Sequence, residues 1–452
     1  MRPPGWERIY MTAREAAFVS LKKFESRGIY TNIEADNTIG KYNLEGPERA
    51  LYTALFYGVV EKQITLDYYL GQLSARPLET LDENVRIILR IGLYQLMYFE
   101  RVPAYAVLDS AARLTRRFAA NSAVAYVNAI LREYTRRQGS LPLPTGMDPG
   151  NRMYRLSVIS SLPIWLCDRW RQTYGEQKAE AIAKALSQPP SMFLRTNTLK
   201  TDTEALLSAL AERGCGAVRT ALSGNGVRLR RPMPVGDIYG FDEGLWFVQD
   251  EASQLCAEIL APEPGMAVLD ACACPGGKSF ALAMLMQNRG RVLSCDLHEN
   301  KLSLVRSGAQ RLGIQIVETA QKNGSEFVPA FENAFDRVLC DVPCSGFGVI
   351  AKKPEIRHKP PEEGERLPKI QYKILENCAR YVRPGGVLVY STCTLDPYEN
   401  EYNVRKFLLA ESDFELLPFA VGSRRAEDGM LTLFPDEFGC DGFFIAGMRK
   451  HG

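Results

Sequence analysis

Apolar positions in the first third of the chain recur at helical spacing. The stretch ERALYTALFYGVVEKQITLDYYLGQL (residues 48–73) places apolar side chains three and four positions apart, and so does ENVRIILRIGLYQLMYFERV (residues 83–102). Two further runs of this kind follow at residues 104–118 and 123–139. These patterns predict an all-α module of at least four helices over residues 1–140.

The pattern changes after residue 140. The stretch LPLPTGMDPGN has no periodicity and is rich in proline and glycine, so residues 141–155 are predicted to be a linker. Residues 156–240 then combine two short helical runs, a strand, a helix and a hairpin, which the Asn225-Gly226 pair between two apolar runs indicates. This segment is predicted to be a small α+β domain.

From residue 241 onward, short apolar runs alternate with amphipathic ones. The helical patterns lie at residues 279–288, 299–312, 366–382 and 397–410. Alternation at this spacing predicts a parallel, doubly wound α/β sheet over residues 241–452, and the final run DGFFIAGMRK is expected to form a hairpin with FELLPF. Ligands of such sheets bind beyond the carboxyl ends of the strands.

Composition sets limits on this interpretation. The chain has 452 residues, which corresponds to two to four domains at about 100–200 residues each. No apolar run approaches the ~18 residues that span a bilayer, and the first residues lack the apolar core of a signal peptide. A cytoplasmic protein that does not engage a membrane is therefore expected. The net charge of +2 does not by itself indicate nucleic acid, so any basic surface must be local.

The cysteines raise a question of function. Without an export signal, the eleven cysteines are expected to be reduced thiols, and the absence of a CxxC pair in a chain with three histidines predicts no bound metal. Two of these residues, Cys344 and Cys393, each follow a predicted strand. A cysteine in such a place is either a packing residue or a reactive group held at the rim of the sheet.

The first strand of the α/β region leads into DACACPGGKSFAL (residues 270–282). Gly276 and Gly277 permit close approach of a ligand to the backbone and to the start of the next helix. A P-loop would require glycine where Cys272 stands, and the dinucleotide pattern G-x-G-x-x-G is absent. Asp296 ends the second strand and is placed to accept hydrogen bonds from a ribose. These features favour S-adenosylmethionine over a nucleoside triphosphate. They also favour a ligand-binding role for the strand-end aspartates over one in which they only cap helices.

Three motifs carry a resemblance to a known family. DACACPGGK, DVPCSGFGVIAKKPEIR and YSTCTLDPYENE resemble the RNA cytosine-5 methyltransferases of the NOL1/NOP2/Sun family, and VQDEASQL (residues 248–255) is similar to the segment that precedes their catalytic fold. ERALYTALFYGVV, RIGLYQLMYFERVPAYAV and YVNAILR resemble the NusB RNA-binding domain. The resemblance covers nearly the whole chain. It implies a multidomain protein with an all-α NusB-like domain, a small RRM-like α+β domain and a Rossmann-like class I methyltransferase domain, as in bacterial members that modify 16S rRNA.

The resemblance also implies roles for individual residues. Cys393 is expected to be the nucleophile, Cys344 to assist product release, and Asp341 to lie beside N3 and the amino group of the cytosine. The implied cofactor residues are Cys272, Ala273, Cys274, Pro275, Gly276, Gly277, Lys278, Asp296, Asn323 and Asp341. Asn323 stands where the family more usually has aspartate, so its contact with the adenine stays open, with Glu326 as a possible substitute.

The chemistry of cytosine methylation agrees with this assignment. C5 of cytosine is too weak a nucleophile to take a methyl group directly, whereas a thiolate that adds at C6 makes C5 enamine-like. The C5 proton must then leave and the thiolate must be eliminated. The expected function is transfer of a methyl group from S-adenosylmethionine to C5 of a specific cytosine in 16S rRNA through a covalent cysteine-C6 adduct.

The RNA is expected to contact basic parts of the chain. The loop GVIAKKPEIRHK (residues 348–359) is predicted to face the RNA backbone. A second candidate is a phosphate-binding patch of arginines on two N-terminal helices, namely Arg113, Arg116, Arg117, Arg132, Arg136 and Arg137. The expected partner is naked or early-assembly 16S rRNA, bound by a monomer. A tRNA substrate, or a non-catalytic RNA-binding factor of ribosome assembly, remains an alternative.

Overall fold

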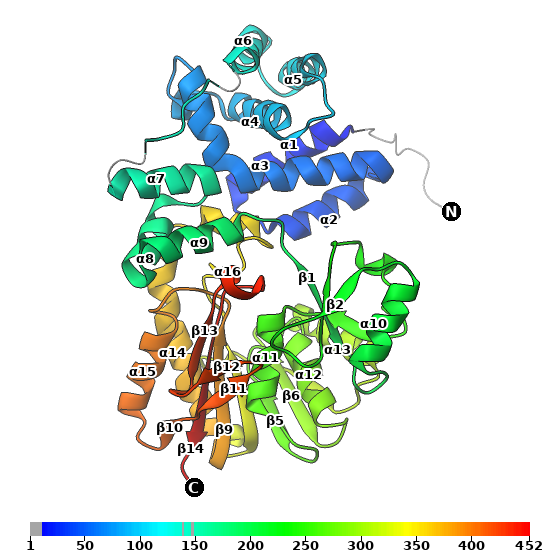
Figure 1. The fold of residues 1–452 in the computed structure, drawn as a ribbon, viewed down its shortest axis with the longest axis vertical. Helices are drawn as coiled ribbons and strands as arrows, with labels where there is room; N and C mark the ends of the chain where they lie inside the picture. Colours follow the sequence, from blue (N-terminus) through cyan, green and yellow to red (C-terminus); the bar gives the residue numbers. More distant parts are fainter. Residues whose placement is uncertain (1–10, 138–139, 146–148) are drawn as a thin grey trace. The chain divides into compact units, whose positions relative to one another are not determined.

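The computed structural model describes residues 11–137, 140–145 and 149–452, and the chain divides into two compact units (Figure 1). Unit 1 is Met1–Ser187 with Ile350–Lys359, and unit 2 is Gln188–Val349 with Pro360–Gly452. Each unit is described by itself below.

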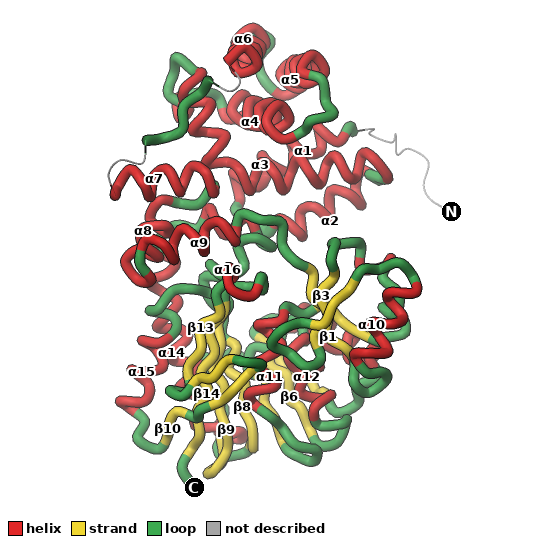
Figure 2. Tube along the Cα trace, in the orientation of Figure 1, coloured by secondary structure: helices red, strands yellow, loops and turns green. Residues whose placement is uncertain are grey.

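Every element that the structure describes in unit 1 is a helix, as Figure 2 shows in red. The helices are α1 (Ala13–Arg27), α2 (Thr31–Tyr42), α3 (Gly46–Leu73), η1 (Leu78–Thr80), α4 (Glu83–Tyr98), α5 (Ala104–Phe118), α6 (Ala123–Arg137), α7 (Pro149–Ser160), α8 (Ile164–Tyr174), α9 (Glu176–Leu186) and η4 (Pro354–His358). Thr12 and Glu15 begin α1 with a capping box, in which each side chain accepts from the other residue's backbone N–H. The prediction of an all-α N-terminal module is confirmed. Among the described helices, none has the length and apolar character needed to cross a bilayer.

Helix α7 begins at Pro149, inside the stretch predicted to be a linker. Proline is favoured at the first turn of a helix because its missing N–H would have no partner there, so the proline and glycine that predicted a break instead open a helix. The Thr65 hydroxyl on α3 donates to the Val158 carbonyl of α7 at 2.6 Å. Helices α7 to α9, of which the larger part was predicted within the small α+β domain, therefore lie in unit 1.

Unit 1 also contains the segment Ile350–Lys359. Arg357 is 2% exposed and donates to the backbone carbonyl of Leu186 at 3.3 Å. The His358 ring bonds with the Val60 carbonyl at 2.9 Å, and burial lowers the pKa of His358, so the ring is neutral. The prediction that this basic loop faces RNA is wrong for Arg357, because the side chain is buried and bonds with backbone carbonyls inside unit 1. The His358 ring is half-buried in the same unit.

The first sheet of unit 2 has four antiparallel strands in the order β2-β3-β1-β4. Its elements are β1 (Met192–Thr196), α10 (Thr203–Glu212), β2 (Ala217–Arg219), β3 (Gly226–Leu229), η2 (Val235–Asp237) and β4 (Trp246–Val248). Strands β2 and β3 pair with Arg219 opposite Val227, which confirms the hairpin that the Asn225-Gly226 pair predicts. The small α+β domain therefore has the sheet and helix that were expected.

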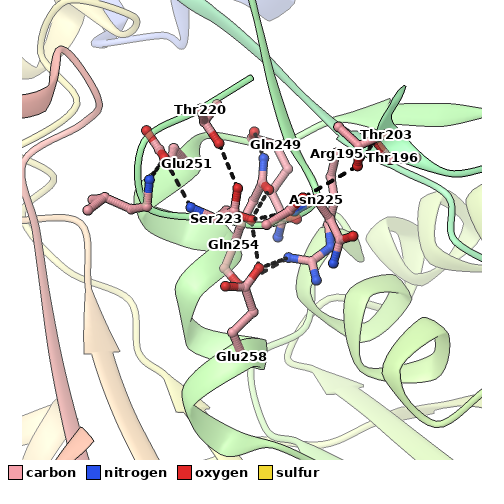
Figure 3. A network of polar contacts seen from close by, with 12 residues as sticks. Arg195, Thr196, Thr203, Thr220, Ser223, Asn225, Gln249, Glu251, Gln254 and Glu258 are labelled. Atoms are coloured by element: carbon pink, nitrogen blue, oxygen red, sulfur yellow. Dashed lines mark hydrogen bonds and ion pairs between the residues drawn. The ribbon is translucent and has the colours of Figure 1, made fainter. Parts of the chain in front are cut away.

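A buried polar network joins this sheet to α11 (Glu251–Leu260), as Figure 3 shows. Arg195 on β1 is 1% exposed and donates to the Gln254 carbonyl at 3.1 Å, with the Glu258 carboxylate 3.4 Å away. The Ser223 hydroxyl contacts side-chain oxygens of both Gln254 (2.8 Å) and Glu258 (2.6 Å). Removing one partner would leave the remaining polar groups buried without a hydrogen-bond partner. The network therefore fixes the small sheet to the helix that opens the larger domain.

The second sheet has the strand order β10-β14-β9-β8-β5-β6-β7, with β13 paired to β14. Its strands are β5 (Ala267–Asp270), β6 (Arg291–Asp296), β7 (Val317–Gln321), β8 (Phe335–Asp341), β9 (Val382–Thr392), β10 (Phe414–Leu416), β13 (Met430–Leu433) and β14 (Phe443–Lys450). The remaining elements are α12 (Gly277–Leu285), α13 (Glu299–Leu312), η3 (Pro329–Phe331), α14 (Glu363–Tyr381), α15 (Glu401–Ala410), β11 (Phe419–Val421), β12 (Arg424–Ala426) and α16 (Pro435–Phe438). Strands β5 to β9 are parallel, and β14 runs antiparallel between β9 and β10. The doubly wound sheet is confirmed, and so is the antiparallel pairing of the last strand with FELLPF, although β11, β12 and β13 separate these two strands in the sequence.

The second sheet is buried on both faces. Val268 belongs to the apolar cluster under α11, α12 and α13, whereas its neighbour Leu269 belongs to the cluster under α14 and α15. Apolar residues on both faces are the reason that the strands read as continuous apolar runs. Because β5 lies between β6 and β8, the carboxyl ends of β5, β6, β8 and β9 meet at one edge of the sheet.

Candidate active site

The edge where these strands end carries most of the predicted site residues. Asp270 ends β5, Asp296 ends β6 and Asp341 ends β8. Cys393 comes directly after β9, and Cys344 comes three residues after β8. The structure therefore brings together residues that are up to 123 positions apart in the sequence.

The two cysteines at this edge contact each other. The Sγ atoms of Cys344 and Cys393 lie 3.2 Å apart, and both residues are reduced and partly buried. The hydrogen bond with Cys393, and then burial, raise the pKa of Cys344 well above its usual range. Cys344 therefore keeps its proton at neutral pH. Either thiol can be the donor of the hydrogen bond between the two sulfurs, and a proton held on one of them favours negative charge on the other.

Asp341 is fixed through both carboxylate oxygens. Lys278 Nζ donates to Oδ2 at 2.7 Å, and the Ser391 hydroxyl donates to Oδ1 at 2.7 Å. Burial alone would lower the pKa of Lys278, but the Asp341 carboxylate outweighs it, so the pKa is raised and the lysine stays an ammonium ion. Ser391 was not predicted. Ser391 lies two positions before Cys393, and alternate residues of a strand share a face. This spacing could have indicated that Ser391 lies at the same site.

The loop between β5 and α12 contains the predicted residues Cys272 to Gly276. The Ala273 N–H donates to the Cys295 carbonyl at 2.8 Å, and the Gly276 N–H donates to the Ala273 carbonyl at 2.7 Å. Gly276 has φ +113°, and a Cβ there would lie 2.5 Å from the Phe280 ring. Only glycine fits this turn, which exposes the start of α12.

Asp296 holds the same loop from the neighbouring strand. Its Oδ2 accepts from the Cys274 N–H at 3.3 Å, and its Oδ1 accepts from the His298 N–H at 3.0 Å. Burial and then Asp296 raise the pKa of Cys274 to about 12, and burial followed by Cys378 raises the pKa of Cys272. Both are neutral thiols, unlike a nucleophile. In the part of the chain that the structure describes, no group of three or more His, Cys, Asp or Glu side chains is arranged to hold a metal ion.

Two buried polar groups beside the loop lack partners. Asp270 is 0% exposed; its Oδ2 accepts from the Ser279 hydroxyl at 2.7 Å, but its Oδ1 has no hydrogen-bond partner among the described residues. Gln249, labelled in Figure 3, is 6% exposed, and neither atom of its amide has a partner within the described ranges. Its Nε2 lies 3.6 Å from where a Cβ on Gly277 would stand. Gln249 was not predicted, although it lies in the VQDEASQL motif.

Asn323 follows β7 and is engaged with its own loop. Its Oδ1 accepts from the Ser325 N–H at 3.1 Å and from the Ser325 hydroxyl at 2.7 Å. Its Nδ2 donates to Glu326 Oε1 at 2.9 Å. The structure thus brings Asn323 and the exposed Glu326 together, and a ligand would have to compete with these bonds for the Asn323 amide.

The arginines predicted to form a phosphate patch lie on α5 and α6 of unit 1. Arg113 pairs with Asp109 at 2.9 Å and Arg136 with Glu133 at 2.6 Å, while both guanidinium groups stay largely exposed. Arg116 is exposed on α5 and Arg132 on α6. Exposed ion pairs contribute little stability, so a phosphate could replace the carboxylate partners at small cost.

Three family models match the chain. The NusB family matches residues 11–136, the ferredoxin-like domain of RsmF/B-like methyltransferases matches residues 162–236, and the 16S rRNA methyltransferase RsmB/F model matches residues 257–449. The three matches follow the order of domains that the sequence motifs indicate.

Curated proteins and solved structures that are similar to this chain agree with these family matches. The probable ribosomal RNA small subunit methyltransferase B of Bacillus subtilis (strain 168) is 37% identical, over 98% of this chain and 99% of that protein. The ribosomal RNA small subunit methyltransferase B of Escherichia coli O1:K1 / APEC is 31% identical, over 89% of this chain and 91% of its own. The crystal structure of PH0851 matches with a TM-score of 0.80 and 26% identity, over 100% of this chain and 99% of that one. A methyltransferase homolog protein from Pyrococcus horikoshii matches with a TM-score of 0.59 and 32% identity, over 66% of this chain and 99% of that one.

The doubly wound sheet, with its glycine loop and acidic strand ends, defines a Rossmann-like class I methyltransferase. Identity above 30% over nearly the whole chain then decides the family. The chain belongs to the 16S rRNA methyltransferase RsmB/F family, and the recognition drawn from the three sequence motifs is confirmed.

Proposed function

We propose that this chain transfers a methyl group from S-adenosylmethionine to C5 of a cytosine in 16S rRNA through a covalent bond between Cys393 and C6. The observation that carries the proposal is the pair of sulfurs 3.2 Å apart at the carboxyl edge of the sheet, next to Asp341. The names of the relatives, ribosomal RNA small subunit methyltransferase B, support rRNA as the substrate.

The residues at this edge fit S-adenosylmethionine. Asp270 Oδ1 and the Gln249 amide are buried polar groups that a ligand could satisfy, since no described residue does so. Asp296 stands at the strand end where a ribose is bound in related folds, and the carboxylates favour a cationic ligand. When bound, the cofactor supplies an electrophilic methyl group.

Cys393 begins the reaction by adding to C6 of the cytosine. The new bond joins its sulfur to C6, and the electrons of the C5–C6 double bond move to C5, which becomes the nucleophile. Asp341 accepts a hydrogen bond from the exocyclic amine of the base, the interaction by which carboxylates recognise cytosine. Lys278 and Ser391 hold that carboxylate in place.

Cys344 ends the reaction. While Cys393 is unreacted, the hydrogen bond between the two sulfurs raises the pKa of Cys344 and keeps it protonated. Once Cys393 is bonded to C6, its sulfur carries no charge, and Cys344 can lose its proton to water. The Cys344 thiolate then takes the C5 proton, the C5–H electrons form the C5–C6 double bond again, and the C6–S bond breaks to return Cys393 as a thiolate.

The target base must leave its stack to reach this edge. Arginines of α5 and α6 are proposed to bind RNA phosphates, and the substrate is proposed to be 16S rRNA that is naked or at an early stage of assembly, bound by a monomer.

The test incubates the protein with methyl-labelled S-adenosylmethionine and a 16S rRNA transcript, an assembled 30S subunit or tRNA, and then maps the product by bisulfite sequencing. Label at C5 of one cytosine of the transcript is expected. Label in tRNA alone would show that the substrate is tRNA and not 16S rRNA. The absence of label in every RNA would favour a non-catalytic assembly factor.

A further inference from the structure

The motif YENE after Cys393 contains a carboxyl group that the mechanism above does not use. Glu399 is 0% exposed. Its Oε2 accepts from the Ser345 N–H at 2.9 Å and from Gln371 Nε2 at 2.6 Å. Its Oε1 has no hydrogen-bond partner among the described residues. Glutamate is almost never fully buried unless its carboxylate is paired, and a buried oxygen without a partner is also rare. The burial of Glu399 therefore requires an explanation.

The bonds of Glu399 hold both sides of Cys344. Ser345 follows Cys344 directly, and its N–H donates to the carboxylate. Gln371 on α14 donates to the same oxygen and also to the carbonyl of Pro343, which precedes Cys344, at 3.0 Å. The carboxylate therefore holds the backbone directly after this thiol through its own bond, and the backbone directly before it through Gln371.

Glu399 is itself fixed to β9, the strand that Cys393 directly follows. The Tyr390 hydroxyl on β9 donates to the Glu399 backbone carbonyl at 2.6 Å. The Thr392 hydroxyl donates to Asn400 Oδ1, and Asn400 Nδ2 donates to the Thr394 carbonyl at 3.0 Å. The loop that carries Glu399 thus has a defined position relative to β9, and through Glu399 the Cys344 backbone acquires one as well.

We infer that Glu399 is a positioning residue that keeps the Cys344 sulfur where it can take the C5 proton from the adduct. The inference rests on the proposed function, because it assigns Glu399 to the release step and not to the attack by Cys393. A proton transfer depends steeply on the distance between donor and acceptor, so a loop that relaxes by about 1 Å slows the step by about 10²-fold. Methyl transfer before that step does not require Cys344 in place.

Glu399 could act through its hydrogen bonds or through its charge, and the structure favours the bonds. Burial raises the pKa of Glu399, and the hydrogen bonds from Ser345 and Gln371 that lower it do not offset this effect. The site therefore disfavours the ionised form of the side chain. In a Glu399→Gln variant the amide oxygen can accept both bonds, and the NH₂ group takes the place of Oε1, which has no partner here. Glutamine should therefore support release, whereas alanine should not.

The experiment compares Glu399→Ala, Glu399→Gln and Cys344→Ser with unchanged protein, using labelled 16S rRNA transcript and S-adenosylmethionine. A denaturing gel detects RNA that remains attached to protein, and single-turnover and steady-state assays separate methyl transfer from release. Glu401→Ala is the matched control, because Glu401 is two positions away and also has a buried oxygen without a described partner, but it bonds to Thr432.

Glu399→Ala is expected to accumulate the attached RNA as Cys344→Ser does, with single-turnover methylation preserved and steady-state turnover reduced about 10²-fold. Glu399→Gln and Glu401→Ala should behave as the unchanged protein. An adduct in Cys344→Ser but not in Glu399→Ala would overturn this inference alone, as would adduct accumulation in Glu399→Gln. No adduct in Cys344→Ser would instead overturn the proposed function.

Calorimetry with S-adenosylmethionine verifies that each variant is folded. If Glu399→Ala does not fold, Gln371→Met carries the test, because it removes the donations to Glu399 and Pro343 with little change in side-chain volume. Gln371→Met is then expected to accumulate attached RNA, and its absence in a folded Gln371→Met protein would overturn the inference.

Discussion

Replacing Asp270 by asparagine should change how the stability of the protein depends on pH. Asp270 is fully buried at the end of β5, and its Oδ2 accepts a hydrogen bond from the Ser279 hydroxyl at 2.7 Å. Burial is the largest cause that raises the pKa of Asp270, from its ordinary value of 3.8 to about 7, while the Ser279 bond opposes it. The folded protein therefore holds this proton more tightly than the unfolded chain does.

The sign and size of the effect follow from proton linkage. Between about pH 4 and pH 7 the folded state binds a proton at Asp270 that the unfolded chain has lost, so the free energy of unfolding falls as the pH rises. A pKa raised this far corresponds to about 4 kcal/mol over the whole range. Between pH 5.5 and pH 8 the loss is about 2 kcal/mol, because the folded carboxyl ionises near pH 7.

Urea unfolding at pH 5.5 and pH 8 measures this change. The Asp270→Asn variant has no proton to lose, so relative to the unchanged protein it should gain about 2 kcal/mol on going from pH 5.5 to pH 8. Ser294→Ala is the matched control, because it removes a hydroxyl that donates to Ser279 at 2.7 Å but leaves the carboxyl in place, and it should keep the original pH dependence. An equal pH dependence in Asp270→Asn and the unchanged protein would refute the argument.

Three further predictions concern ligands. Asp296→Ala should remain folded and lose about 10- to 100-fold in S-adenosylmethionine affinity by calorimetry, since a charged hydrogen-bond partner is removed; undiminished binding would remove the assignment. Gln249→Leu should also weaken S-adenosylmethionine binding in the same assay, because its buried amide would no longer be available, and unchanged affinity would contradict a contact. Replacing Arg116 and Arg132 together by glutamine should reduce the slope of log affinity for single-stranded RNA against log salt by about 1.4, and an unchanged slope would place the RNA elsewhere.

Much of the fold could be predicted because the strands of the parallel sheet are buried on both faces. Val268 and Leu269 are consecutive apolar residues that face opposite clusters, and runs of this kind alternating with helical patterns indicate a doubly wound sheet. The β2–β3 hairpin was predictable from the apolar runs on either side of Asn225-Gly226, although the connection is the longer loop 220–225 and Gly226 already lies in β3. The site edge followed from topology, because parallel strands end together.

The segment Ile350–Lys359 could not be placed from its composition. Its lysines, arginine and histidine indicate a solvated surface, yet Arg357 is buried and His358 is half-buried in unit 1. Their side chains bond with the carbonyls of Leu186 and Val60, which are far away in the sequence. Deleting residues 1–140 would therefore remove Val60 and expose this segment. Surface substitutions in the full chain are the cleaner test of RNA binding by unit 1.

Buried polar groups were also beyond the sequence. Glu399 lies in a polar motif and Gln249 in another, and nothing in either motif indicates that the side chain is inaccessible to water. Their burial depends on residues such as Ser345, Gln371 and Gly277, which the fold brings from other elements. Helix α7 was missed for a different reason, because proline and glycine predict a break but can also open a helix.

The covalent role of Cys393, with a separate role for Cys344, is the central claim, and a denaturing gel of RNA incubated with cysteine variants tests it most directly. Cys344→Ser should give a slow-migrating band of RNA attached to protein, because the nucleophile is intact and release is blocked. Cys393→Ser and the double variant should give no band, since no bond to C6 can form. A band that survives Cys393→Ser would mean that the roles assigned to the two cysteines are reversed. Methylation retained by Cys393→Ser without any band would contradict the covalent mechanism.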